Sequence, residues 1–239
     1  MANPPSIPRS AFTFLKDLKA NNNRPWFEAH KARYQENLAA LESFADALLT
    51  SLNHHDRLET PSGKQSLYRF YRDIRFSKDK SPYKSYWGGH FTRSGRDRRG
   101  GYYFRFEPGD SRITGGFWGP NATDLRLIRE DIAFDDQPLR KLLKAKKFTD
   151  AFGSLQGEQL KRVPYGFDPQ HPAADLLRHK QFLLIKRFTD KEVHSPDFLS
   201  RVADAFVRMR PFFDYMSMIL STDANGESNN KLVSEKEEP

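Results

Sequence analysis

A change in the spacing of the apolar residues most constrains how this chain can fold. Between residues 66 and 118, aromatic residues alternate with polar ones, and glycines interrupt the pattern. A repeat of two residues is typical of a β-strand with one buried face. The linkers between successive stretches are too short for parallel crossovers, so the pattern predicts antiparallel pairing. The four expected strands lie in SLYRFYRDIRF, SYWGGHFTRS, GGYYFRFEPG and SRITGGFWGP.

Helical spacing frames this central region on both sides. Ser10 can cap a first helix that ends at the asparagines 21–23, and Pro25 suits the first turn of a second helix. The second helix carries one apolar stripe at three- and four-residue steps, made of Trp26, His30, Tyr34, Leu38, Leu41, Ala45, Leu48 and Leu52. Further helical patterns cover 125–132, 139–143, 172–177 and a last helix that starts at Ser195.

These patterns predict an α+β fold, in which a central antiparallel sheet is packed by N-terminal and C-terminal helices. The sheet covers about residues 66–118, and QFLLIKRFT at 181–189 is a candidate further strand. No linker divides the chain, so residues 10–220 are expected to form a single globular domain. The proline-rich residues 1–9 are expected to be a flexible arm, and the polar, acidic residues 221–239 a disordered tail.

Two absences limit the function classes. The chain has no cysteine, which excludes disulfides, thiolate metal sites and thiol catalysis and suits a reducing compartment. No apolar run approaches the ~18 residues of a membrane span. The N-terminus MANPPSIPRS also lacks the apolar core of a secretory signal. We therefore expect a cytoplasmic protein without a membrane partner.

The net charge of +8 is concentrated in one part of the chain. The cationic residues of this part are Lys64, Arg69, Arg72, Arg75, Lys78, Lys80, Lys84, Arg93, Arg96, Arg98, Arg99 and Arg105. Within the same range only Asp73, Asp79 and Asp97 oppose them. A local excess of positive charge favours an anionic partner.

The segment RFYRDIRFSKDKSPYK, residues 69–84, is the densest part of this region. Interpreted as a strand, residues 67–76 place four side chains on the core face, namely Tyr68, Phe70, Ile74 and Phe76. Asp73 then shares the other face with Arg69 and Arg75, which leaves a surplus of positive charge there. A helix over the same residues is the alternative, and the run of Tyr, Phe and Ile favours the strand.

In the strand interpretation Arg72 falls on the core face. An unpaired buried charge is costly, so Arg72 needs a partner such as Glu107 or a cluster of carbonyl groups. The turn SKDKSPYK that follows can bring three lysines beside the arginines of the opposite face.

Such a cradle suits a small anionic ligand that bears phosphate. Arginine pairs two oxygen atoms with its planar fork, and lysine adds a point charge. The sequence leaves open whether phosphoryl transfer or hydrolysis follows binding. The expected ligand-binding residues are Arg69, Arg72, Asp73, Arg75, Lys78, Asp79, Lys80, Tyr83 and Lys84.

Two other interpretations of these charges stay open. The loop RSGRDRRGG, residues 93–101, is typical of basic loops that follow nucleic-acid phosphates. A nucleic-acid-binding module that does not discriminate sequence is therefore one alternative. The other is an internal network of ion pairs that only fixes the fold, formed by Arg69, Arg72, Asp73 and Asp79.

A metal site has less support. His171, Asp175 and His179 recur every four residues, but Pro172 places the start of a helix among them. Asp73 and Glu107 could hold Mg²⁺ if their strands are neighbours, yet nothing in the sequence requires it. The glycines match no phosphate-binding loop, and we predict neither a metal nor another cofactor.

The segment RFYRDIRFSKDKSPY resembles the signature RxxRDxRFxx[DN]KxxY of a widespread, mostly bacterial family, domain-of-unknown-function family 2461. The similarity covers about residues 12–220 and includes FLKDLKANNNRPWFEAHKARY, GGFWGP, IRE and VPYGFDPQHPAADLLRHK. The signature positions fall on Arg69, Arg72, Asp73, Arg75, Phe76, Asp79, Lys80 and Tyr83. The resemblance implies a shared site at these residues and names no activity.

Overall fold

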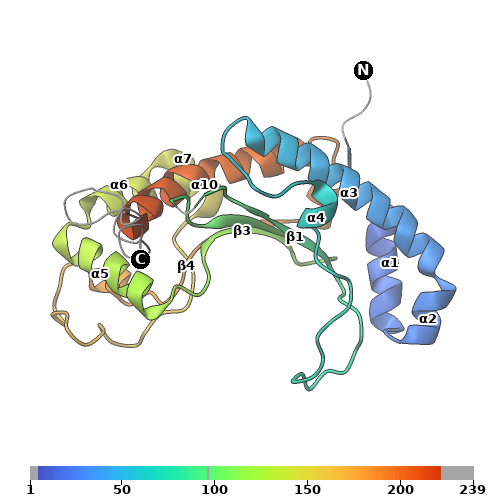
Figure 1. Cartoon of the computed structure of the whole chain (residues 1–239), viewed down its shortest axis with the longest axis horizontal. Coiled ribbons are helices and arrows are strands. Elements are labelled where there is room, and N and C mark those ends of the chain that lie inside the picture. The colour runs from blue at the N-terminus through green and yellow to red at the C-terminus, as the bar shows by residue number, and fades with distance from the viewer. Residues whose placement is uncertain (1–4, 96, 222–239) are drawn as a thin grey trace, which may run out of the picture. The chain divides into compact units, whose positions relative to one another are not determined.

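The computed structural model of the chain describes residues 5–95 and 97–221 (Figure 1). Two compact units are distinguished: unit 1 consists of Met1–Thr92, Tyr102–Thr114 and Lys186–Val207, and unit 2 of Arg93–Gly101, Gly115–Ile185 and Arg208–Pro239. The predicted tail, apart from Ser221, and the first four residues of the predicted arm lie outside the described residues. Ile7, within the predicted arm, is buried, and its carbonyl oxygen lies 3.1 Å from Nδ1 of His194. The single domain over 10–220 stays a prediction.

In the described chain, helices precede and follow a group of three strands, and a fourth strand comes later. The first helices, all in unit 1, are α1 (Arg9–Ala20), α2 (Arg24–Ala29), α3 (Lys31–Asn53) and α4 (Gly63–Ser66). The strands are β1 (Trp87–Thr92), β2 (Gly101–Phe106), β3 (Ser111–Phe117) and β4 (Phe182–Phe188). Unit 2 holds α5 (Ala122–Phe134), α6 (Gln137–Lys144), α7 (Lys146–Phe152) and α8 (Ala174–Leu177). The last helices are α9 (Asp190–Val193), in unit 1, and α10 (Phe198–Ser221).

The four strands form one antiparallel sheet in the order β1-β2-β3-β4, which confirms the α+β fold class. The candidate strand at 181–189 is β4. Side chains alternate between the two faces of the sheet. In β2, Tyr102, Phe104 and Phe106 are buried, whereas Tyr103 and Arg105 are only half-buried. One face of the sheet is therefore a core face, and we call the opposite one the open face.

Aromatic side chains fill the core of unit 1. The ring of Phe106 in β2 lies edge-on to Phe44 of α3, with ring centroids 5.7 Å apart. The same ring meets Phe198 of α10 at 5.3 Å, and Tyr102 meets Phe206 of α10 at 5.1 Å. In unit 1, α3 and the first part of α10 thus cover the core face of the sheet.

Unit 2 has a core of its own. Ile128 and Ile132 of α5 are fully buried there, as the helical spacing predicted. The second part of α10 contributes Met209 and Phe213, which are also fully buried. None of the helices in the described part of the chain combines the length and the apolar character needed to cross a membrane.

The long helix predicted from Pro25 onward is instead the pair α2 and α3, which separate at His30. Asn23 caps α2 by accepting a hydrogen bond from the backbone N–H of Trp26 at 3.0 Å, and Pro25 lies in the first turn as predicted. His30 has a φ of −114°, outside the helical range, and its ring stacks on that of Trp26 with centroids 4.0 Å apart. The stripe holds within α3, where Leu41, Ala45, Leu48 and Leu52 are buried.

The strand predicted at 66–76 is wrong. Residues 67–86 form an irregular segment, which we call the basic loop and which Figure 1 shows extending away from the sheet between α4 and β1. The four side chains predicted to share a core face do not do so, because only Phe70 among them is deeply buried. Phe76 is 96% exposed and Tyr68 is 40% exposed.

Charged side chains of the basic loop explain the failure. Asp73 accepts a hydrogen bond from the backbone N–H of Arg75 at 3.2 Å, and Asp79 accepts one from that of Ser81 at 2.9 Å. Short acidic side chains that bind nearby backbone groups favour turns over a strand ladder. The helical alternative for this segment is not formed either.

Candidate functional site

The basic loop is held to the rest of unit 1 by contacts far apart in the sequence. An isolated bridge joins Leu67 to Gly89 of β1, and another joins Tyr71 to Tyr83 inside the loop. Asn22 binds both backbone groups of Tyr83: its Nδ2 donates to the carbonyl oxygen at 3.0 Å, and its Oδ1 accepts from the N–H at 3.1 Å. One polar side chain beyond the end of α1 thus fixes the second half of the loop.

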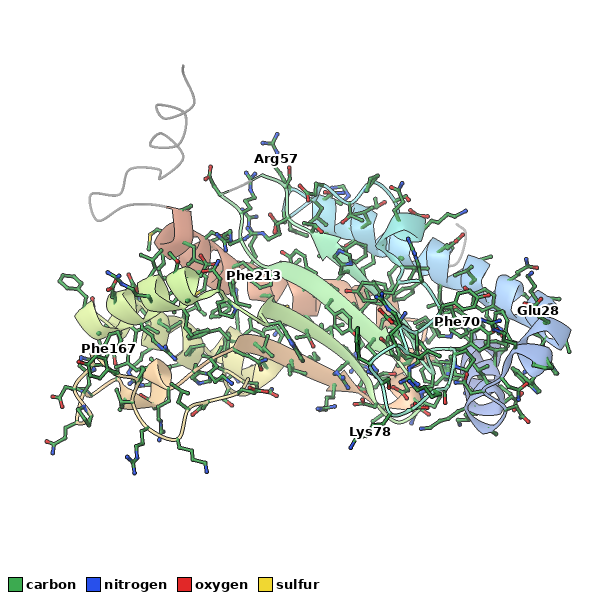
Figure 2. All side chains as sticks on the ribbon, turned by 60° about the horizontal axis from the view of Figure 1, so that its bottom comes forward. Glu28, Arg57, Phe70, Lys78, Phe167 and Phe213 are labelled. Atoms are coloured by element: carbon green, nitrogen blue, oxygen red, sulfur yellow. The ribbon has the colours of Figure 1, made fainter. Side chains whose placement is uncertain are left out.

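Aromatic packing anchors the loop as well. Tyr83 is 1% exposed, and its ring stacks on Phe27 of α2 with centroids 4.2 Å apart. Phe70 stacks on Trp87 of β1 at 5.3 Å. Figure 2 shows Phe70 surrounded by other side chains, and Lys78 at the outer edge of the loop. Tyr83 therefore serves as an anchor, and its burial raises the pKa of its hydroxyl.

Arg72 has internal partners, as the sequence analysis required. They include carbonyl oxygens, one of the two kinds of partner expected, and do not include Glu107. Its guanidinium forms an ion pair with Asp79 and donates to the carbonyl oxygen of Ser81 at 3.2 Å. Hydrogen bonds from the Ser81 side chain and backbone, followed by that from Arg72, lower the pKa of Asp79 to about 2. At neutral pH Asp79 is a fixed negative charge that holds Arg72 in place.

A second pair involves Asp73 and Arg75. The guanidinium of Arg75 donates to both carboxylate oxygens, with Nε at 3.0 Å and Nη2 at 2.7 Å. These bonds lower the pKa of Asp73. Neither aspartate of the loop is therefore a suitable general base near neutral pH, because each strongly favours its ionised form.

The lysines of the loop differ from the arginines in their partners. Lys84 Nζ donates to the carbonyl oxygens of Arg69 and Tyr71, the latter at 2.7 Å. Lys80 Nζ donates to the carbonyl oxygen of Ile74 at 3.0 Å. Neither lysine forms an ion pair with a carboxylate of the described residues. Burial, and then the nearby charge of Arg72, lower the pKa of Lys84.

A cleft of about 580 Å³ lies beside the loop in unit 1. We call it the basic cleft, and its walls come from the end of α1, the basic loop and β2. Its lining residues are Lys19, Asn22, Arg72, Asp73, Asp79, Ser81, Tyr83, Lys84, Ser85, Tyr86 and Arg105. The lining thus combines four cationic groups with two carboxylates.

The basic cleft brings together part of the predicted site. Of the nine predicted residues, those that line it are Arg72, Asp73, Asp79, Tyr83 and Lys84. Those outside its lining are Arg69, Arg75, Lys78 and Lys80. Arg69 and Lys78 are exposed on the loop. That all nine residues bind one ligand stays a prediction.

Sequence reasoning missed the walls that come from other elements. Lys19 and Asn22 carry no local signal for a site, because only the fold brings them to residues some 60 positions later. Arg105 could have been placed by strand alternation, since Phe104 and Phe106 on either side of it are buried. Its guanidinium lies 4.0 Å from the ring centroid of Tyr86 and forms an ion pair with Glu107.

The weaker metal candidates are not assembled. Asp175 forms an ion pair with Arg140, and Nε2 of the buried His179 lies 3.0 Å from the amide of Gln159. Glu107 is bound to Arg105 and to Ser85, so it is not paired with Asp73. The described residues contain no group of three or more His, Asp or Glu side chains that could hold a metal ion.

The described arginines of the loop at 93–101 are bound within unit 2, and Arg96 lies outside the described residues. Arg93 is 3% exposed and forms an ion pair with Asp214, and Arg99 forms one with Asp124. Arg98 donates to the carbonyl oxygen of Ser94 at 3.2 Å. Two arginines of this loop thus have carboxylate partners within unit 2, and nucleic-acid binding by the loop stays a prediction.

These features define an α+β protein with a basic cleft beside a long, internally paired loop. The chain matches, over residues 10–215, the model of a family described as conserved hypothetical protein (DUF2461), and it belongs to this family. The resemblance noted in the sequence is thereby confirmed. No curated protein and no solved structure matches the chain.

Proposed function

We propose that the protein binds a small anionic, phosphate-bearing ligand in the basic cleft. The observation that carries the proposal is the state of Lys84. Lys84 is half-buried in the wall of the cleft that Arg72 also lines, and the hydrogen bonds of its ammonium group go to carbonyl oxygens only. A partly desolvated cation next to another cation is stabilised when an anion enters.

The other cations of the cleft differ in whether a carboxylate of the protein already neutralises them. Arg72 and Arg105 already have carboxylate partners, Asp79 and Glu107. Lys19 is exposed and forms no ion pair within the described residues. The surplus positive charge of the cleft therefore lies on Lys19 and Lys84, and the paired arginines can still donate from their remaining N–H groups.

The size and polarity of the cleft suit a small ligand. Ligand pockets span roughly 300–1,000 Å³, a range that includes the 580 Å³ of this cleft. Asn22, Ser81 and Ser85 supply neutral polar groups beside the cations. Binding is proposed without a reaction, because the two carboxylates of the cleft are held ionised by their partners.

A structural role for part of the signature is the second candidate, and the ion pairs favour it. Arg72 with Asp79 and Arg75 with Asp73 need no external anion, so these four residues act in shaping the loop. Lys19 and Lys84 are outside that network of pairs. The two roles are therefore assigned to different residues of one loop and cleft.

Isothermal titration with inorganic phosphate, a sugar phosphate and polyphosphate tests the proposal. Lys84→Met and Lys19→Met each remove one charge from the cleft, and Lys64→Met removes one at an exposed position of α4, elsewhere in unit 1. Loss of a charged hydrogen bond costs about 1.5–3 kcal/mol, so each cleft variant is expected to bind about tenfold more weakly or worse.

The Lys64→Met control is expected to bind as the wild type does. Lys19 has no hydrogen-bonding role in the fold of the described chain, so Lys19→Met reports on binding even if Lys84→Met disturbs the loop. The proposal is overturned if no phosphate compound produces heat, or if all three variants bind equally well.

A further inference from the structure

The open face of the sheet in unit 1 carries a set of aromatic rings beside the basic cleft. Strand alternation places His90 of β1 and Tyr103 of β2 on this face, opposite the buried Phe91 and Phe104. Tyr68, at the start of the basic loop, donates its backbone N–H to the carbonyl oxygen of Gly88 at 2.9 Å. Its side chain therefore stands next to β1.

The ring of Tyr68 contacts both of the other rings. The rings of Tyr68 and His90 are stacked, with centroids 5.3 Å apart and planes inclined by 19°. The ring of Tyr103 lies 6.0 Å from that of Tyr68. His90 is exposed, Tyr68 is 40% exposed and Tyr103 is half-buried. We call Tyr68, His90 and Tyr103 the aromatic platform, because aromatic side chains are seldom left exposed together without a partner.

Tyr86 connects the platform to the basic cleft. A side chain at Gly88 would meet the ring of Tyr86 at 2.9 Å, so the missing Cβ lets that ring lie against β1. The guanidinium carbon of Arg105 lies over the same ring, 4.0 Å from its centroid, and Tyr86 and Arg105 both line the cleft. Burial raises the pKa of the Tyr103 hydroxyl to about 12. Cleft and platform are therefore neighbouring parts of one surface of unit 1.

We propose that the ligand of the basic cleft is a nucleoside phosphate, whose phosphate enters the cleft and whose base stacks on the aromatic platform. This inference rests on the proposed function and adds the chemical class of the ligand. Bases stack on exposed aromatic rings whatever their sequence, while a neighbouring basic groove takes the phosphate.

The charge on the rest of the open face is consistent with this ligand. Arg112 of β3 and Arg187 of β4 both pair with Asp110, so one carboxylate serves two guanidiniums. The remaining positive charge would lie beside a sugar–phosphate group. The same chemistry is offered by a free mononucleotide and by the end of a single-stranded nucleic acid, and the test distinguishes these two sources.

Titration calorimetry with AMP, ribose 5-phosphate and a six-residue oligoadenylate provides the test. A stacked base strengthens binding on the order of tenfold or more, so AMP is expected to bind at least tenfold more tightly than ribose 5-phosphate. His90→Ala is expected to remove most of this difference while ribose 5-phosphate binding is retained. Tyr165→Ala, which removes an exposed ring in unit 2, is the matched control and is expected to change neither.

The possible outcomes separate the two proposals. Equal affinity for AMP and ribose 5-phosphate overturns the nucleoside assignment and leaves the anion cleft standing. A preference for AMP that His90→Ala and Tyr68→Ala both leave unchanged overturns the platform as its cause. Absence of binding by all three compounds overturns both proposals. Tighter binding of oligoadenylate than of AMP identifies a nucleic-acid strand as the source, and equal binding identifies the free nucleotide.

Discussion

At the scale of single residues, Asp79 organises the basic loop. It accepts hydrogen bonds from the hydroxyl of Ser81 at 2.6 Å and from its backbone N–H at 2.9 Å, and it pairs with Arg72. These donors all favour the carboxylate over the carboxylic acid. The turn and the position of Arg72 in the cleft wall therefore depend on Asp79 being ionised.

This dependence predicts how stability responds to acid. The pKa of Asp79 lies at about 2 in the folded protein, against an ordinary value of 3.8. Because the unfolded chain takes up the proton first, the stabilisation by Asp79 is present in full above its ordinary pKa and is lost as the pH falls toward 2. Urea unfolding of the wild type and of Asp79→Asn at several pH values measures it.

The wild type is expected to be more stable than Asp79→Asn at pH 6, and the difference is expected to shrink as the pH falls from about 4 to about 2. A difference between the two proteins that stays constant over this range would contradict the role assigned to the carboxylate.

At the scale of elements, the basic loop depends on contacts with α2 and with the turn between α1 and α2. Asn22 supplies two hydrogen bonds to the backbone of Tyr83, and Phe27 supplies the ring on which Tyr83 stacks. The loop therefore has a defined conformation in unit 1 although it contains no regular strand.

Asn22→Ala is expected to destabilise the protein by about 1–3 kcal/mol, since each of two hydrogen bonds is worth roughly 0.5–1.5 kcal/mol. Asn21→Ala is the control: its side chain makes one exposed, local hydrogen bond to the carbonyl oxygen of Asp17. Its effect is expected to stay within about 0.5 kcal/mol. Equal free energies of unfolding for the two variants, measured in urea, would show that Asn22 does not clamp the loop.

The same elements show what the sequence could and could not predict. Strands β1 to β4 and the stripe of α3 were predictable because their apolar repeat matches a buried face. The segment at 66–76 has a similar repeat, yet its aspartates bind nearby backbone groups and its Phe76 faces solvent. Alternation alone does not distinguish a strand from a loop whose charges pair internally.

The site was predictable only where it depends on neighbours in sequence. The charge density of 69–84 pointed to Arg72 and Lys84, and both line the basic cleft. Lys19 and Asn22 could not be found, because their proximity is a product of tertiary packing. The sequence left the carboxylate partner of Arg72 open, since both Glu107 and Asp79 were possible.

At the scale of the whole molecule, the boundary between units 1 and 2 falls inside β2, β3, β4 and α10. Unfolding either unit alone would therefore interrupt four regular elements. We predict that residues 10–220 unfold as one cooperative domain. In scanning calorimetry, the calorimetric and van't Hoff enthalpies should then agree. Two separated transitions would show that each unit is an independent domain.

The central claim is that an anion occupies the basic cleft, and a crystal structure determined in the presence of inorganic phosphate tests it most directly. The account predicts phosphate within hydrogen-bond distance of Lys84 Nζ, with Lys19 or Arg72 as a second donor. A cleft that holds no phosphate at saturating concentration, with Lys84 still bound only to the carbonyl oxygens of Arg69 and Tyr71, would contradict it.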